Sequence, residues 1–151
     1  MSVKLISAGM VIAICGLAIW TVGNFNKVQS ITPLSGYSKS YSLYYPKPMP
    51  SGLYYKFNSV RDLEDQITYE LIGPSGGVVL TQQAKPAQLS SFKLDGFSQV
   101  STPNGTMYLG LIGDRVTGIV STQGTLITIT AQKDFGLDRV TVIANQLVKV
   151  K

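Results

Sequence analysis

One segment near the N-terminus limits what this chain can fold into more than any other feature. From Leu5 to Gly23 the sequence reads LISAGMVIAICGLAIWTVG and contains no charged residue. As a helix it would be roughly 28 Å long at about 1.5 Å per residue, which matches the hydrocarbon core of a bilayer. It is longer than a typical signal-peptide core and lacks a good cleavage site. We therefore expect residues 1–23 to be a retained single-pass membrane anchor, with cleavage near Asn24 as the alternative.

The rest of the chain is expected to lie outside the cell. Lysines flank the apolar segment on both sides, so the charge rule does not decide the orientation. The remaining sequence is rich in Tyr, Ser, Thr and Gly, and it has no cysteine after Cys15, as is typical of exported domains. We therefore predict a stalk over residues 24–37 and an extracytoplasmic domain over residues 38–151, attached to the cell membrane.

Turn residues divide this domain into short segments of strand type. QITYELIG and VVLTQQ flank the turn at residues 74–77, and a second hairpin surrounds TPNG at residues 102–105. Turns at residues 113–114 and 122–124 extend it into an antiparallel meander. Aromatic runs at residues 41–45 and 53–57 also predict strands. A short helix is expected after Pro86.

The C-terminal segment LDRVTVIANQLVKV predicts an amphipathic helix with Asp138 as its N-cap. Four apolar residues recur at helical spacing: Val140, Ile143, Ala144 and Leu147. Such a stripe must be buried, and one face of the sheet is the obvious partner. The predicted fold is α+β, a mostly antiparallel sheet of about five to seven strands with this helix packed on it.

The composition excludes several kinds of chemistry. The chain has no histidine, and its only cysteine, Cys15, lies in the apolar segment, which excludes Ser-His-Asp and Cys-His nucleophiles and nearly every zinc site. The acids of RDLED, Asp62, Glu64 and Asp65, lie too close in sequence for a typical glycosidase pair, and we interpret them as a solvated turn. Scattered lysines give a formal charge of +5 without a basic face, which argues against nucleic acid. We expect no enzyme activity, no metal and no cofactor.

The stretch SLYYPKPMPSGLYYKF concentrates aromatic residues around three prolines. Three interpretations remain open: one tyrosine of each pair packs in the core, or the outward rings bind a sugar or peptide, or the rings lie at the level of lipid headgroups. The candidate ligand or partner surface consists of six residues: Tyr44, Tyr45, Lys47, Tyr54, Tyr55 and Lys56.

The order of YSLYYPKPMPSGLYYKF, ITYEL, VVLTQQ, GTLITITA and VTVIANQLVKV over residues 38–150 resembles a domain-of-unknown-function family. That family forms the extracytoplasmic part of some Gram-positive anti-sigma factors and of other single-pass envelope proteins. The resemblance implies a sensory or binding module without catalytic residues. Only Met1 to Lys4 precede the apolar segment, so we do not expect this chain to sequester a sigma factor.

The sequence thus predicts a membrane-anchored extracytoplasmic binding or sensory module of the bacterial cell envelope, acting by non-covalent interaction. Its expected partners are the membrane, through residues 5–23, and another membrane protein or a cell-wall or lipid component. One alternative is a carrier or sensor of lipid or another hydrophobic ligand, with a cavity lined by Leu109, Ile127 and Ile143. Another is a structural subunit of an envelope or secretion assembly.

Overall fold

A computed structural model describes residues 34–89 and 94–150 of the protein. The predicted membrane anchor, residues 1–23, and most of the predicted stalk lie outside the described residues. Among the described residues, no helix combines the length and the apolar character needed to cross a membrane. Thr32–Lys151 forms one compact unit. Leu34, at the end of the predicted stalk, is fully buried in its core.

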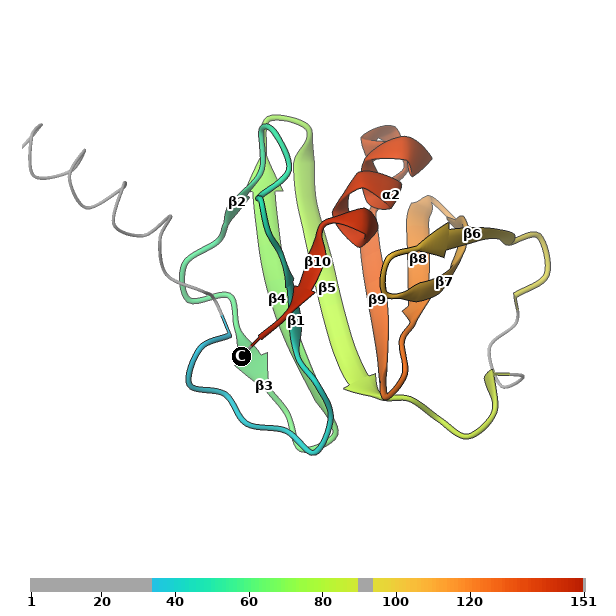
Figure 1. Ribbon diagram of the computed structural model, residues 1–151. Coiled ribbons are helices and arrows are strands. Elements are labelled where there is room, and N and C mark those ends of the chain that lie inside the picture. The colour runs from blue at the N-terminus through green and yellow to red at the C-terminus, as the bar shows by residue number, and fades with distance from the viewer. Residues whose placement is uncertain (1–33, 90–93, 151) are drawn as a thin grey trace, which may run out of the picture. The chain divides into compact units, whose positions relative to one another are not determined.

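The described residues form an antiparallel sheet, a small two-stranded ribbon and one α-helix (Figure 1). The eight strands of the sheet are β2 (Tyr54–Tyr55), β3 (Arg61–Asp62), β4 (Gln66–Gly73), β5 (Gly76–Ala84), β6 (Ser98–Thr102), β7 (Gly105–Ile112), β8 (Arg115–Ser121) and β9 (Thr125–Gln132). Their order is β2-β4-β5-β9-β8-β7-β6, and β3 also pairs with β4. The remaining elements are β1 (Tyr44–Pro46), the 3-10 helix η2 (Lys133–Phe135), α2 (Leu137–Asn145) and β10 (Leu147–Lys149).

The predicted α+β class, the hairpins and the meander are confirmed. Pro74 and Ser75 connect β4 to β5, while Pro103 and Asn104 connect β6 to β7. Proline at the first position of such a turn removes a donor where the strand has already ended. Gly76 has φ +102, a conformation that residues with a Cβ rarely adopt, so the first turn depends on glycine there.

The predicted number of strands is wrong, because the sheet has eight rather than five to seven. Strand β3 was not expected, and both β2 and β3 are only two residues long and pair with the same edge of β4. The strand expected over residues 53–57 is thereby reduced to β2. The strand expected over residues 41–45 becomes β1, which pairs with β10 instead of joining the main sheet.

One face of the sheet carries the core. Cross-strand pairing aligns its side chains in rows, and one row crosses six strands: Ile67, Gln82, Ile127, Val120, Met107 and Val100. All of these except Val100 are fully buried. The opposite face is more polar, with Thr68, Thr81 and Thr128 in register across three strands. This difference follows from the alternation of side chains along each strand.

Helix α2 covers the core face over β7, β8 and β9, as Figure 1 shows. Val140, Ile143 and Ala144 are buried against the sheet as predicted. Two details of the predicted helix are wrong. Asp138 lies in the first turn and Gly136 occupies the N-cap position. Leu147 lies beyond the end of the helix in β10, where it pairs with Pro46.

The ribbon of β1 and β10 covers the other half of the same face, in front of β4 and β5 in Figure 1. Fully buried Gln82 fixes it there, because its amide bonds both backbone groups of Tyr44. Tyr44 N donates to Gln82 Oε1 at 2.8 Å, and Gln82 Nε2 donates to Tyr44 O at 2.7 Å. The Gln82 side chain thus makes the two hydrogen bonds to Tyr44 that the backbone of a neighbouring strand would make.

The short helix expected after Pro86 was predicted over a range that includes part of residues 90–93, and those residues lie outside the described part of the chain.

Candidate functional site

The structure places the two predicted tyrosine pairs on strands that belong to different sheets. Tyr44 and Tyr45 lie on β1, and Tyr54 and Tyr55 lie on β2. Tyr44 and Tyr55 pack against the core, whereas Tyr54 is 42% exposed and Tyr45 is half-buried outside the core cluster. The alternation predicted for each pair is therefore present, and only the outward rings are available for contact.

Buried Tyr69 connects the two pairs beneath the surface. Its ring packs against Tyr55 with 6.4 Å between centroids and a tilt of 56°. Its hydroxyl donates to Tyr44 O at 3.2 Å. Complete burial raises the pKa of Tyr69 far above its usual value, and Tyr55 adds to the shift. Tyr44 and Tyr55 therefore pack beneath the candidate ligand or partner surface and support it.

Exposed aromatic side chains gather around β2. Tyr37 is 37% exposed, Tyr54 is 42% exposed and Phe57 is 65% exposed. Burial raises the pKa of the Tyr55 hydroxyl, and the Tyr37 hydroxyl adds to this shift, so the two hydroxyls lie within range of an electrostatic interaction. We call the three exposed residues, Tyr37, Tyr54 and Phe57, the aromatic edge. The sequence analysis did not select Tyr37 or Phe57, although Phe57 ends the quoted aromatic stretch.

The two candidate lysines lie on different elements. Lys56 directly follows β2, and its Nζ pairs with Glu70 Oε2 at 2.6 Å while its backbone N donates to Glu70 O at 2.9 Å. Lys47 follows β1, is exposed, and donates its backbone N to Gln146 O at 2.8 Å. The aromatic edge therefore has Lys56 and Glu70 as its adjacent charges, and Lys47 belongs to the loop near the end of α2.

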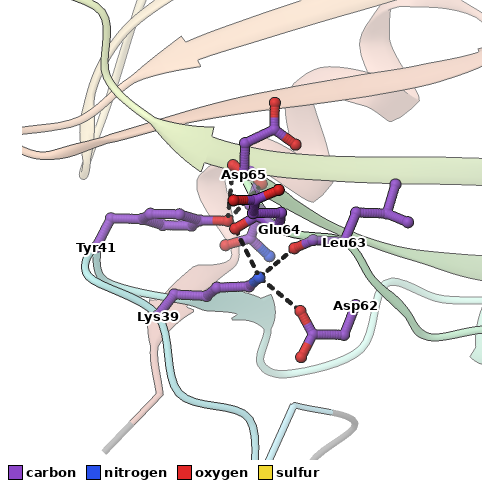
Figure 2. A network of polar contacts seen from close by, with 7 residues as sticks. Lys39, Tyr41, Asp62, Leu63, Glu64 and Asp65 are labelled. Carbon is purple, nitrogen blue, oxygen red and sulfur yellow. Dashed lines mark hydrogen bonds and ion pairs between the residues drawn. The ribbon is translucent and has the colours of Figure 1, made fainter.

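The acidic run at residues 61–65 is held in place by Lys39, as Figure 2 shows. The Lys39 ammonium donates to Leu63 O and, at 3.4 Å, to Glu64 O, and it pairs with Asp62 Oδ1 at 2.6 Å. The Lys39 side chain is only 11% exposed. A cation that bonds two carbonyls and a carboxylate fixes the turn, so Asp62 has a structural partner.

Tyr41 extends this network toward the core. Its hydroxyl donates to Gln82 O at 2.9 Å and lies 3.5 Å from Asp65 O (Figure 2). Desolvation raises the pKa of Tyr41, and the nearby charges of Asp62 and Asp65 add to the shift. This network could not be predicted from the sequence, since Lys39 lies in a turn-rich segment and its partners lie more than twenty residues away.

The arrangement favours non-covalent contact. No group of three or more His, Cys, Asp or Glu side chains is placed to hold a metal ion in the part of the chain that the structure describes. Aromatic rings on a supported strand offer flat apolar area at a small cost in side-chain entropy. The aromatic edge is therefore a candidate surface for a ligand or partner.

Comparisons of this chain with protein-family models, curated proteins and solved structures found no match. The family resemblance over residues 38–150 therefore remains a prediction from the sequence pattern.

Proposed function

We propose that this protein is a membrane-anchored extracytoplasmic module of the bacterial cell envelope that binds a cell-wall polymer through its aromatic edge. The apolar segment, residues 5–23, supplies the anchor. The domain acts by binding, and the ligand class is a sugar or peptide chain whose flat faces stack on tyrosine and phenylalanine rings. The module reports on or attaches to the wall without changing it.

The exposure of Phe57 and Tyr54 is the observation that carries this proposal. Tyr54 lies on β2 at the edge of the sheet, and Phe57 follows this strand two residues after its end. Phe57 is the most exposed large apolar side chain among the described residues. Leaving large apolar rings in water is unfavourable, and their grouping at a supported edge is typical of binding surfaces. The adjacent Lys56 and Glu70 pair adds polar groups that orient a ligand.

Co-sedimentation of the full chain with purified cell-wall sacculi tests the binding. Tyr54→Ala with Phe57→Ala should reduce the bound fraction at least about tenfold, since each lost stacking contact contributes about 1 kcal/mol. Val142→Ala is the matched control, because Val142 is 45% exposed on α2, away from β2. Equal loss in the control, or unchanged binding in the double variant, would contradict the proposal. Binding of the wild type to lipid vesicles but not to sacculi would favour a headgroup partner instead.

Protease treatment of whole cells tests the location. The domain should be digested from intact cells, while a fluorescent tag placed before residue 1 should stay protected until lysis. Digestion only after lysis would place the domain inside the cell. Release of a mature chain that begins near Asn24 would make the module secreted.

A further inference from the structure

Strand β6 forms one edge of the main sheet. It lies last in the strand order and pairs with β7 over its full length, from Ser98 opposite Leu109 to Thr102 opposite Gly105. No strand pairs with its outer side among residues 34–89 and 94–150. Such an edge presents a row of backbone N–H and C=O groups that can pair with another strand.

The opposite edge of the sheet has features that prevent edge pairing, and the residues of β6 lack them. Beyond β4, β2 and β3 are two-residue strands separated by an irregular segment in which Asn58 has φ +58. That edge also carries Lys56, Arg61 and Asp62. Interrupted strands and charges are the usual features that prevent edge pairing. β6 has neither, because its five residues read SQVST, without charge, in one regular ladder.

The side chains of β6 are compatible with a second β6. Val100 is the central residue of the strand and ends the apolar row next to Met107. It packs against the core but remains only partly buried. Antiparallel pairing about a two-fold axis at Val100 places this residue opposite itself, which completes the burial of both valines. Gln99 then lies opposite Ser101 and Ser98 opposite Thr102, so no like charges meet.

The backbone of β6 supports the same register. Thr102 faces Gly105 across the turn, so the backbone groups of alternate residues, Gln99 and Ser101, point to the outer side. In the two-fold register Gln99 lies opposite Ser101 of the second copy, and the two residues exchange both hydrogen bonds. Pro103 has no N–H and ends the pairing. Asn104 Nδ2 donates to Leu147 O at 2.7 Å and holds this end of the hairpin against β10.

We infer that the free edge of β6 is a self-association surface, on which a second copy of this chain adds its own β6 antiparallel and extends the sheet across a two-fold axis. The partner is a second copy because the strand is uncharged, regular and centred on a valine that continues the apolar row. A contact of five residues a side is small against the roughly 1,600 Å² of a standard interface, so the dimer is weak and forms at high local concentration.

Cysteine cross-linking of the full chain in mild detergent tests this register. Val100→Cys on a Cys15→Ser background should give a disulfide-linked dimer under a mild oxidant, because residues at a two-fold axis of a non-hydrogen-bonded pair approach within disulfide range. Gln123→Cys on the same background is the control, since Gln123 is exposed in the turn between β8 and β9. Equal cross-linking of both variants, or none of Val100→Cys, would overturn the inference.

Paired charges provide a second test that leaves Val100 intact. Gln99→Lys with Ser101→Lys places lysine opposite lysine twice, and self-association measured by sedimentation should weaken about tenfold. Gln99→Glu with Ser101→Glu should weaken it similarly, whereas a mixture of the two variants should associate again. Unchanged circular dichroism shows that each variant folds. A wild type that stays monomeric at about 1 mM, or an edge that binds only a different protein's extended segment, would refute the second copy as partner.

Discussion

At the scale of single residues, Gln82 determines where the N-terminal part of the domain lies. It occupies a core position of β5 between Ile67 and Ile127, where the alternating pattern of the strand calls for an apolar side chain. A buried amide without partners would be costly. Its two bonds to Tyr44 satisfy both the amide and the backbone of β1. The remaining contacts on this face are mostly apolar and do not fix a direction. The two hydrogen bonds of Gln82 therefore determine a single position for the ribbon of β1 and β10.

Replacement of Gln82 by methionine should destabilise the domain by about 1–3 kcal/mol, because it leaves the part-buried Tyr44 N–H without its acceptor. The free energy of unfolding from urea titration measures this change. Gln83→Met is the control, since Gln83 is the next residue, half-buried on the opposite face, and it should cost less than about 0.5 kcal/mol. Equal effects of the two substitutions would mean that the Gln82 bonds add nothing to stability.

At the scale of elements, the approach of α2 to the sheet depends on Gly118 in β8. A Cβ at this position would lie 2.7 Å from Val140 Cγ1 and 3.2 Å from Met107 Sδ. Val140 is β-branched and fully buried, so its methyl group cannot turn away easily. The absence of a side chain at position 118 lets the helix pack directly on the strand.

Gly118→Ala should therefore destabilise the domain by about 1–3 kcal/mol through overpacking. Val140→Ala alone should also be destabilising because it leaves a cavity. The two substitutions combined should cost less than the sum of the separate effects, since the added methyl group occupies part of the removed volume. A double-mutant cycle in urea measures the coupling, and strictly additive effects would contradict the packing.

At the scale of the whole molecule, folding removes the Tyr69 hydroxyl from water and partly desolvates the hydroxyls of Tyr41 and Tyr55. The pKa values of Tyr41, Tyr55 and Tyr69 are all raised above the usual 10.0, with desolvation as the largest cause. A raised pKa means that the folded state holds these protons more tightly than the unfolded state does. Stability from these groups is therefore complete below about pH 10 and is lost as the pH rises above it.

We expect the free energy of unfolding to fall steeply with pH above about 10. Tyr69→Phe should cost about 1 kcal/mol at neutral pH, through the lost bond to Tyr44 O. It should also make the alkaline decline shallower, because the most strongly shifted group is removed. Urea titrations from pH 7 to about 11 measure both quantities. An identical decline in wild type and variant would show that Tyr69 does not contribute to it.

The hairpins, the meander and the helical stripe could be predicted because each depends on residues close in sequence. The candidate surface was predicted only in part. Tyr54 lies at the aromatic edge, with Lys56 next to it. Tyr44 and Tyr55 support this edge from below, and Tyr37 joins it from a distant segment. Short-range patterns carry no information on which rings meet across the fold, so this part required the structure.

The sequence by itself determined the α+β class, the faces of the long strands and the exclusion of histidine and cysteine chemistry from the domain. Alternation and turn residues depend only on neighbouring positions in the chain, and composition does not depend on the fold. Only the tertiary structure decided that Leu147 leaves the helix to pair with Pro46, that Lys39 fixes the acidic turn, and that no described strand pairs with the outer side of β6. These features join residues far apart in the chain. Their energies depend on burial and on distances that exist only once the chain is folded.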